Sequence, residues 1–301
     1  MKYYRFKTFT TSYYFPKLNA DQQYMYGLYS PYGGKLSRVY WWLFRKSRLV
    51  RNFTTVKEDT LPFPYQKIMQ IDGTDCLMSF NMGSPGVEQK ISILGYDNKS
   101  GKPFFAKFSQ KSAALKLTEN EIKVYRLLSD TGLTPKLLGY KVGQGYAYLK
   151  AEFVPGKRPE SRNLTESIVG LCISLAGFHF NKDIDCDGLK HSLSHGDFCP
   201  WNMLCHEGKI RLIDWELADE RPLGYDLFTY ICNVSALFEP ETPLIAQIDR
   251  NKNYINSYFS TIGVEDYTPY LRSFVKTKYE YEASKGNSTL AKPYQQLLNS
   301  L

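Results

Sequence analysis

The chain has 301 residues, of which 43% are hydrophobic and 15% aromatic, a composition that excludes a disordered chain and predicts a substantial core. No apolar run approaches the roughly 20 residues that a membrane-spanning helix needs. The basic start MKYYRFKTF lacks the apolar core of a signal peptide, so we expect a cytoplasmic protein.

Charge is spread unevenly along the chain. The net charge is +8, and residues 1–65 alone hold 11 Lys or Arg against 3 Asp or Glu. Residues 156–301 hold 15 against 19 and are mildly acidic. The basic excess therefore belongs to a front segment, and it suggests an anionic partner for that segment.

The six cysteines include no C-x-x-C pair, so a zinc ribbon or a thioredoxin-like site is not expected. Cys205 and His206 are adjacent, but zinc would need further ligands, and a strand followed by a turn is the favoured interpretation. We expect free, mostly buried thiols in a reducing compartment.

The front segment contains one predicted helix. Residues 1–35 are rich in Tyr, Gly, Asn and Pro without a sustained period, and we expect irregular structure there. Residues 36–51 have helical spacing, with an apolar stripe that consists of Leu36, Val39, Tyr40, Leu43, Ser47 and Val50. A basic, Trp-bearing helix of this kind either lies on an anionic membrane surface or packs its stripe on the body of the protein, and we favour packing.

The middle of the chain predicts a small antiparallel sheet. Three strands are expected within residues 76–108, from alternating apolar residues separated by turns. A helix follows at 115–129, and residues 132–153 predict two more strands joined by a Gly-rich turn. The expected order is therefore three strands, one helix and two strands.

The pattern changes after Pro155-Gly156, and a boundary is expected at about 151–160. Residues 164–180 predict an apolar helix, and the sequence from about residue 224 onward is helical with breaks. Between them lie short strands that carry the most informative residues of the chain.

Two polar motifs stand between these short strands. SHGDFCPWNML, residues 194–204, supplies Asp197 and Asn202, and IRLIDWE, residues 210–216, supplies Asp214. Carboxylate and amide oxygens suit Mg²⁺, which is commonly bound together with substrate phosphates. Asn202 and Asp214 would then hold the metal, and Asp197 would orient a hydroxyl and accept its proton, as phosphoryl transfer requires.

At these residues the chain resembles a known family. His195-Gly196-Asp197 followed by Asn202 resembles the H-x-D-x-x-x-x-N catalytic loop of protein-kinase-like enzymes, and Ile213-Asp214-Trp215-Glu216 resembles their metal-binding strand. The H-G-D and D-W-E forms together are similar to those of the aminoglycoside phosphotransferase and choline kinase superfamily.

The resemblance implies a fold. We expect an α+β bilobal protein-kinase-like fold, with a small antiparallel-sheet N-lobe carrying one main helix and a larger, mostly helical C-lobe. The expected division is a basic extension at 1–65, a nucleotide-binding N-lobe at 66–152 and a catalytic, acceptor-binding C-lobe at 153–301.

The resemblance also implies residues that bind ATP. Lys107 in the third strand would contact the α- and β-phosphates, and Glu121 on the following helix would pair with it, with Glu119 as the competing choice. The segment 148–156, which includes Glu152 and Phe153, resembles the hinge whose backbone would hold an adenine.

Three further features qualify the resemblance. Gly83 and Gly86, in G-S-P-G, stand where the family has a phosphate-binding glycine loop, but Pro85 removes one donor and a plain hairpin turn would look the same. His195 is expected to be a scaffold residue rather than a general base. Asp226 resembles the family's downstream Asp that braces the catalytic loop.

The acceptor is expected to be a small hydroxylated molecule. Only nine residues, 217–225, separate Glu216 from Asp226, too few for the activation segment that docks a peptide on protein kinases. A sugar, an amino alcohol or an aminoglycoside would then bind among helices of about 236–301. The tyrosines there either form a box for an amine or pack the helices, which we favour; they are Tyr254, Tyr258, Tyr267, Tyr270, Tyr279 and Tyr281.

The sequence therefore predicts a kinase that transfers the γ-phosphate of ATP, with Mg²⁺, to a small acceptor. The alternative is a non-catalytic nucleotide-binding pseudokinase, which the complete set of catalytic residues argues against. No nucleic-acid partner is expected, because the basic residues gather in one appendage rather than along a groove with stacking aromatics. The oligomeric state and the choice between ATP and GTP stay open.

Overall fold

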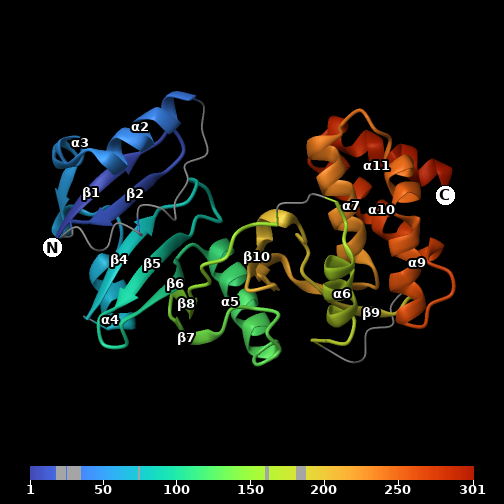
Figure 1. The fold of residues 1–301 in the computed structure, drawn as a ribbon, viewed down its shortest axis with the longest axis horizontal. Coiled ribbons are helices and arrows are strands. Elements are labelled where there is room, and N and C mark those ends of the chain that lie inside the picture. The colour runs from blue at the N-terminus through green and yellow to red at the C-terminus, as the bar shows by residue number, and fades with distance from the viewer. Residues whose placement is uncertain (18–24, 26–34, 74, 160–162, 181–187) are drawn as a thin grey trace. The chain divides into compact units, whose positions relative to one another are not determined.

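The computed structural model describes residues 1–17, 25, 35–73, 75–159, 163–180 and 188–301. Two compact units make up the chain (Figure 1). The first comprises Met1–Ser129 and Pro135–Phe153, and the second comprises Asp130–Thr134 and Val154–Leu301. The first unit therefore contains both the basic front segment and the predicted N-lobe.

An antiparallel sheet of eight strands forms the centre of the first unit, in the order β3-β1-β2-β4-β5-β6-β8-β7. The strands are β1 (Lys2–Lys7), β2 (Ser12–Pro16), β3 (Thr55–Lys57), β4 (Cys76–Asn81), β5 (Ile91–Asp97), β6 (Lys102–Ser109), β7 (Leu137–Gly143) and β8 (Tyr146–Glu152). The predicted order of three strands, a helix and two strands is confirmed by β4, β5, β6, α5 (Ser112–Leu127), β7 and β8.

The front of the chain is not irregular as expected, because β1 and β2 form a hairpin that pairs with β4. Aromatic residues alternate along this hairpin: Tyr3 and Tyr14 contribute to one core, while Tyr4 and Phe15 contribute to another. The alternation follows from the two-residue repeat of a strand, which sends successive side chains to opposite faces. The remainder of the predicted irregular stretch, 18–24 and 26–34, lies outside the described residues.

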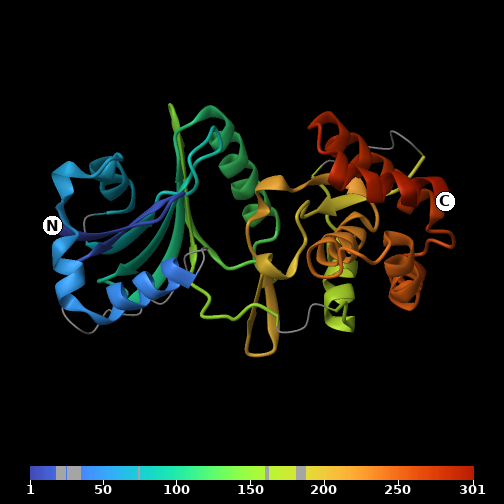
Figure 2. The same ribbon diagram turned by 90° about the horizontal axis from the view of Figure 1, so that it is seen from above.

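Helices cover both faces of the sheet. α4 (Tyr65–Asp72) packs on the face with Tyr3 and Phe80, and α2 (Lys35–Lys46) with α3 (Arg48–Phe53) packs on the opposite face (Figure 2). A short 3-10 helix, η2 (Glu58–Thr60), lies between β3 and α4. The single predicted helix at 36–51 is thus two helices, and they are separated at Ser47, whose side chain accepts a hydrogen bond from the Val50 N–H and caps α3.

The helix packs on the body of the protein as favoured, but most of the predicted stripe is not the packed face, and of that stripe Tyr40 stacks on Phe6. Trp41 and Phe44 are buried against the β1–β2 hairpin, where both rings contact Phe6, with centroid distances of 4.8 and 5.2 Å. The stripe residues Leu36 and Val39 are 86% and 55% exposed. The helix is apolar on two faces, and the larger aromatic rings occupy the buried one because they cover more apolar area there.

The second unit is mostly helical. Its helices are α6 (Glu166–Leu175), α7 (Tyr225–Phe238), α8 (Leu244–Arg250), α9 (Lys252–Thr261), α10 (Thr268–Ser284) and α11 (Ser288–Ser300). Two small antiparallel sheets join β10 (Met203–His206) to β11 (Lys209–Leu212) and β9 (His191–Ser194) to β12 (Asp219–Pro222). A unit built on an antiparallel sheet, followed by a mostly helical unit, confirms the predicted α+β class and its division into a sheet-based part and a mostly helical part.

Two general properties of the described residues follow. No described helix combines the length and the apolar character that crossing a bilayer requires. The described cysteines are free, in agreement with the prediction, and Cys186 lies outside the described residues.

Candidate active site

The segment from β9 to α7 positions the motif residues of the second unit. The chain leaves β9 at Ser194, passes His195 to Cys199, and continues through η3 (Pro200–Asn202) into β10. Gly196 has φ +83°, and a Cβ atom there would lie 2.2 Å from the backbone oxygen of Leu217. Only glycine fits this position, because it tolerates the left-handed backbone and the close approach of the neighbouring chain.

Asp226, in the first turn of α7, holds the start of this loop. Its carboxylate accepts hydrogen bonds from the Ser194 hydroxyl at 2.7 Å, the His195 N–H at 2.7 Å and the Gly196 N–H at 3.1 Å. Asp226 is buried, so these donors replace the water that the carboxylate would otherwise need. The loop backbone is thereby tied to a helix that belongs to the core of the unit.

The His195 side chain is fully buried and connects the two motifs. Its Nε2 lies 2.9 Å from the backbone oxygen of Ile213, and its Nδ1 lies 3.3 Å from the Asp197 N–H. These partners assign the tautomer in which Nε2 donates and Nδ1 accepts. The ring also packs on Trp215, with centroids 4.5 Å apart. With both nitrogens bonded to backbone groups, the ring acts on the positions of the two loops.

The Asp197 carboxylate lies among three side-chain donors. The Asn202 amide donates to Oδ2 at 2.9 Å and to the Asp197 backbone oxygen at 2.9 Å. The Trp201 indole N–H is 3.4 Å from Oδ2, and the Cys199 thiol is 3.5 Å from Oδ1. Because the nitrogen of Asn202 faces Asp197, its amide oxygen is the atom that suits a metal.

The Cys199 thiol stays protonated beside Asp197. Burial raises its pKa well above the usual value for a thiol, and the negative charge of Asp197 raises it further. The sulfur also accepts a hydrogen bond from the Asn233 amide at 3.4 Å. Cys199 therefore serves as a donor to Asp197 and links it to α7.

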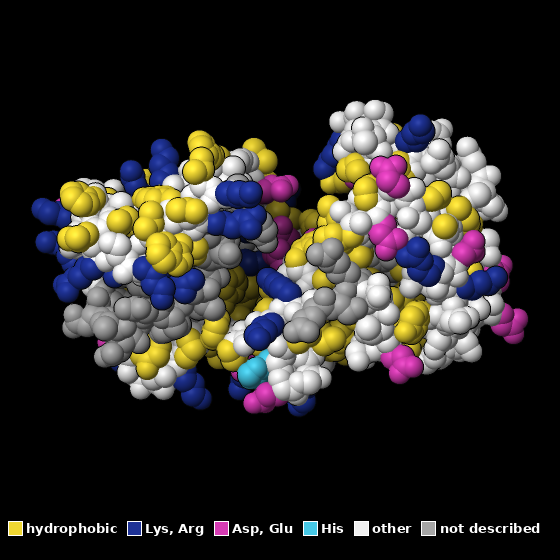
Figure 3. Space-filling view, turned by 45° about the horizontal axis from the view of Figure 1, so that its top comes forward, with side chains coloured by type: hydrophobic (Ala, Val, Ile, Leu, Met, Phe, Trp, Pro, Cys, Tyr) yellow, Lys and Arg dark blue, Asp and Glu magenta, His cyan; other side chains and the backbone are white. Residues whose placement is uncertain are grey.

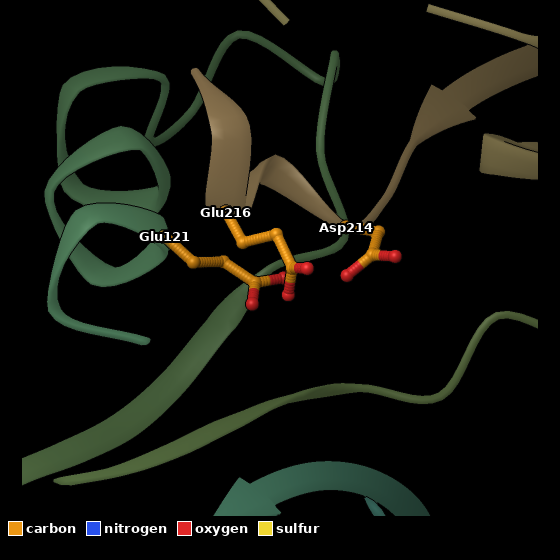
Figure 4. A group of neighbouring side chains, drawn as sticks. All are labelled: Glu121, Asp214 and Glu216. Atoms are coloured by element: carbon orange, nitrogen blue, oxygen red, sulfur yellow. The ribbon is translucent and has the colours of Figure 1, made fainter. Parts of the chain in front are cut away.

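Asp214, in the second motif, lies at a turn just before a 3-10 helix. It has φ +68° and ψ +54°, a left-handed conformation that is uncommon for a residue other than glycine. η4 (Trp215–Leu217) follows directly, and the turn brings the Glu216 carboxylate within 4.8 Å of that of Asp214 (Figure 4). Such a conformation away from the common regions is typical of functional sites.

The donor set of the second unit fits a hard cation. Asp214 and Glu216 offer carboxylate oxygens, and Asn202 offers an amide oxygen. Oxygen ligands of this kind suit Mg²⁺ or Ca²⁺ rather than a thiophilic metal. Glu216 was not predicted as a ligand, although it stands in the D-W-E motif; the signal was a second carboxylate two residues after Asp214.

In the first unit, Lys107 and Glu121 form a buried ion pair. The ammonium of Lys107 on β6 lies 2.9 and 2.7 Å from the two carboxylate oxygens of Glu121 on α5. The side chains are 9% and 1% exposed. Beside the pair, the Ser109 and Thr118 hydroxyls lie 2.6 Å apart and tie β6 to α5. Of the two glutamates considered, Glu121 and not Glu119 pairs with Lys107.

The glycine loop between β4 and β5 is held by hydrogen bonds to other parts of the first unit. Gly83 has φ +63°, and its N–H donates to the Asn81 side chain at 3.0 Å. The Lys111 ammonium, from the N-terminal end of α5, donates to the backbone oxygen of Gly86 at 2.6 Å and to Gln89 at 3.0 Å. The Gly83 N–H thus faces a protein acceptor, and the loop is fastened to the helix that carries Glu121.

The predicted hinge lies at the end of β8, where the first unit ends. The Glu152 N–H donates to the Lys136 backbone oxygen at 2.8 Å, and its carboxylate accepts from the Lys136 N–H at 3.3 Å. The Glu152 N–H is therefore engaged within the sheet, and Phe153 is the last residue of the first unit.

Packing accounts for two of the C-terminal tyrosines. Tyr258 and Tyr270 are buried, and the Tyr258 hydroxyl accepts a hydrogen bond from the Gly224 N–H at 3.0 Å. Burial raises the pKa of Tyr258 well above its ordinary value. These two residues agree with the favoured interpretation that the tyrosines pack helices, whereas Tyr281 is 52% exposed.

The structure thus brings Asp197, Asn202 and His195 together in the second unit, and Lys107 and Glu121 together in the first. Sequence reasoning missed the donors Cys199 and Trp201. Their spacing of two and four residues from Asp197, within the quoted motif, was the available signal.

Comparisons with known proteins agree with the motif. Residues 181–254 match the model of the phosphotransferase enzyme family, a range that contains the whole segment from β9 to α7. No curated protein sequence matches the chain.

Several solved structures are similar at low identity. Amicoumacin kinase hAmiN, in complex with AMP-PNP, Ca²⁺ and Ami, is 12% identical over 79% of this chain and 94% of that chain, with a TM-score of 0.47. A putative fructosamine-3-kinase from Haemophilus somnus 129PT is 15% identical over 71% and 89%, with a TM-score of 0.46. Aminoglycoside-3'-phosphotransferase of type VIII is 17% identical over 58% and 83%, with a TM-score of 0.40. At these values the likenesses add no argument about the substrate.

The family match falls on the residues that carry the predicted resemblance, and the loop geometry agrees with the roles of those residue types. The segment of this chain that carries the catalytic motifs is therefore similar to the phosphotransferase enzyme family.

Proposed function

We propose that this protein is a small-molecule kinase that transfers the γ-phosphate of ATP to a hydroxyl of a sugar, an amino alcohol or an aminoglycoside. The observation that carries the proposal is the environment of Asp197. Its carboxylate is oriented by Asn202 and Trp201, on a loop that Asp226 ties to the core. A carboxylate held in this way is suited to align a hydroxyl and to accept its proton.

In the proposed chemical step, Asp197 acts on the acceptor hydroxyl and Lys107 acts on the nucleotide phosphates. As the acceptor oxygen forms a bond to the γ-phosphorus, the bond between that phosphorus and the bridging oxygen of ADP breaks, and Asp197 takes the hydroxyl proton. Lys107, held by Glu121, would contact the α- and β-phosphates. Most of the rate gain would come from alignment and charge stabilisation.

Asn202, Asp214 and Glu216 would hold one or two Mg²⁺ ions. When bound, the metal neutralises charge on the phosphates. Gly83 offers little to the nucleotide because its N–H is engaged by Asn81, so we assign the loop with Gly83 and Gly86 a covering role over the phosphates. The backbone of Phe153 and the carbonyl of Glu152 would face the adenine.

The short connection after Glu216 supports a small acceptor rather than a protein substrate. This connection includes the short strand β12, which pairs with β9 and ends two residues before α7 begins. It contains no segment that would dock a peptide. We place acceptor binding in residues 153–301, nucleotide binding in residues 66–152, and the protein in the cytoplasm.

A screen for acceptor-stimulated consumption of ATP tests this function. The purified chain is incubated with Mg-ATP, or Mg-GTP, and a panel of sugars, amino alcohols and aminoglycosides, and phosphorylated products are identified by mass spectrometry. At least one hydroxylated acceptor should gain a phosphate, and the Asp197→Asn variant should form none. Nucleotide binding without any phosphorylated product across the panel, and without Asp197-dependent hydrolysis, would instead support the pseudokinase alternative.

A further inference from the structure

The helices α2 and α3 carry an apolar surface that is exposed among the residues that the structure describes. It consists of Leu36, Val39, Trp42, Leu43, Leu49 and Phe53, and we call it the outer surface. Trp42, Leu49 and Phe53 are 59%, 73% and 91% exposed. Leu36, Val39 and Leu43 follow the spacing that places residues on one helix face. Leaving this much apolar area in water is unfavourable unless a partner covers it.

Basic residues accompany this outer surface. Lys35, Arg38, Arg45, Lys46 and Arg48 are all exposed on the same two helices. The sequence from Gln22 to Lys57 contains no Asp or Glu. Figure 3 shows hydrophobic side chains gathered among Lys and Arg on the part of the first unit that bears α2. The positive charge is therefore uncompensated within the segment.

The outer surface is held in place by the packing beneath it. Trp41 and Phe44 anchor α2 on the β1–β2 hairpin, and the two rings stack at 5.7 Å. The buried Arg51 of α3 donates to the backbone oxygens of Phe44 and Arg45, at 2.9 and 2.6 Å. These bonds fix α3 to the end of α2, so both helices present their outer side chains together.

From these observations we propose that the outer surface docks on an anionic lipid bilayer. Apolar side chains such as Leu36 and Leu49 would enter the boundary between head groups and acyl chains, where Trp42 suits the interface. The long stems of Lys and Arg bury their methylene groups and place their charges among the lipid phosphates. The chain would thus bind peripherally, through this surface.

Charge argues against a second copy of the chain as the partner. In a two-fold dimer the same patch meets itself, so Arg38 and Arg45 would face basic residues of an identical surface. Like charges at such an interface are destabilising, whereas a bilayer of anionic lipid compensates them.

Flotation of the whole chain with vesicles tests the proposal. Phosphatidylcholine vesicles with and without phosphatidylglycerol are compared at low and high salt. One variant, Leu36→Ser with Trp42→Ser, removes apolar contacts, and another, Arg38→Gln with Arg45→Gln, removes charge. Matched controls are Leu138→Ser with Val142→Ser on β7, at residues 50% and 49% exposed, and Lys252→Gln with Arg272→Gln on α9 and α10.

The wild-type chain should float with anionic vesicles and should bind neutral ones at least about tenfold more weakly. Each outer-surface variant should lose about tenfold or more in partitioning, and the controls should match wild type. Thermal unfolding checks that all variants are folded; only the outer side chains are changed, so their midpoints should agree.

Three outcomes would overturn the proposal. The first is a wild-type chain that does not bind anionic vesicles, and the second is binding that both outer-surface variants retain. The third is a dimer in sedimentation experiments that these variants lose while vesicles bind no protein, which would assign the outer surface to a second copy.

Discussion

At the scale of single residues, the Lys107–Glu121 pair combines a stability role with the proposed contact to phosphate. Two charges removed from water are tolerated only while each compensates the other. Replacing Lys107 by Met leaves the Glu121 carboxylate buried and unpaired, at a cost of about 3–5 kcal/mol in the free energy of unfolding. Urea unfolding monitored by circular dichroism measures this loss.

Two comparisons separate the stability role from the catalytic one. The double variant Lys107→Met with Glu121→Leu should regain most of the lost stability yet stay inactive, because no ammonium faces the phosphates. Arg250→Met breaks the exposed Arg250–Glu239 pair, whose side chains are 58% and 43% exposed, and should change stability far less than Lys107→Met, because water screens the pair. A Lys107→Met variant as stable as Arg250→Met would contradict the assigned burial.

At the scale of elements, the loop between β9 and β10 depends on Gly196. An alanine there would place Cβ 2.2 Å from the Leu217 oxygen, so either the loop or the η4 turn must shift. We expect Gly196→Ala to destabilise the protein by about 1–3 kcal/mol and to lower turnover more than 100-fold, because Asp197 is the next residue. Gly208→Ala, at the β10–β11 turn with φ +74° but open space around it, is the matched control.

Steady-state kinetics and urea unfolding of the two variants distinguish backbone strain, which lowers stability, from displacement of Asp197, which lowers turnover. Gly208→Ala shares the strained backbone and should lose stability with turnover nearly unchanged. Equal turnover in Gly196→Ala and wild type would show that the contact with Leu217 does not position Asp197.

The elements that could be predicted are those with a strong local period. The strands β4, β5 and β6 and the helix α5 follow from alternation and helical spacing, and they place Lys107 and Glu121 correctly on neighbouring elements. The β1–β2 hairpin was missed because both faces of its strands carry buried residues, each face in a different core. Aromatic residues therefore follow one another along the strands, and the alternation of apolar and polar residues that indicates a strand is absent. The division at Ser47 was missed because a serine inside a helical period gives a weak capping signal.

Individual contacts of the site were less predictable than its motif. The Asp197–Asn202 relation follows from spacing, since η3 turns the chain back within five residues. The donors Cys199 and Trp201 depend on how that turn directs each side chain, which a linear spacing does not specify. The orientation of α2 likewise depends on the hairpin surface, which selected Trp41 and Phe44 over the predicted stripe.

At the scale of the whole molecule, buried thiols make the stability sensitive to alkaline pH. Burial raises the pKa of Cys76 and of Cys232 to about 12, above the ordinary thiol value of 9.0. Below pH 9 both forms of the protein keep these thiols protonated, so they add no pH dependence. Above it the unfolded chain loses the protons first, so the free energy of unfolding should fall as pH rises.

Urea unfolding at pH 8 and pH 10 measures the effect. Each such thiol contributes at most about 1.4 kcal/mol per pH unit above its unfolded pKa. The Cys232→Ala variant should show a smaller decrease between the two pH values than wild type. An identical decrease in both proteins would contradict the contribution of Cys232.

The two units contain complementary parts of the proposed chemistry: an ammonium for the nucleotide phosphates in the first, and a proton acceptor with metal-binding oxygens in the second. The most direct test of whether they work as one phosphotransferase compares the Asp197→Asn variant with wild type. The rate of the slow Mg-ATP hydrolysis without acceptor and the affinity for the nucleotide are measured for both proteins. Hydrolysis should fall at least about 100-fold while affinity stays within about twofold of wild type. Hydrolysis at the wild-type rate in this variant would contradict the account.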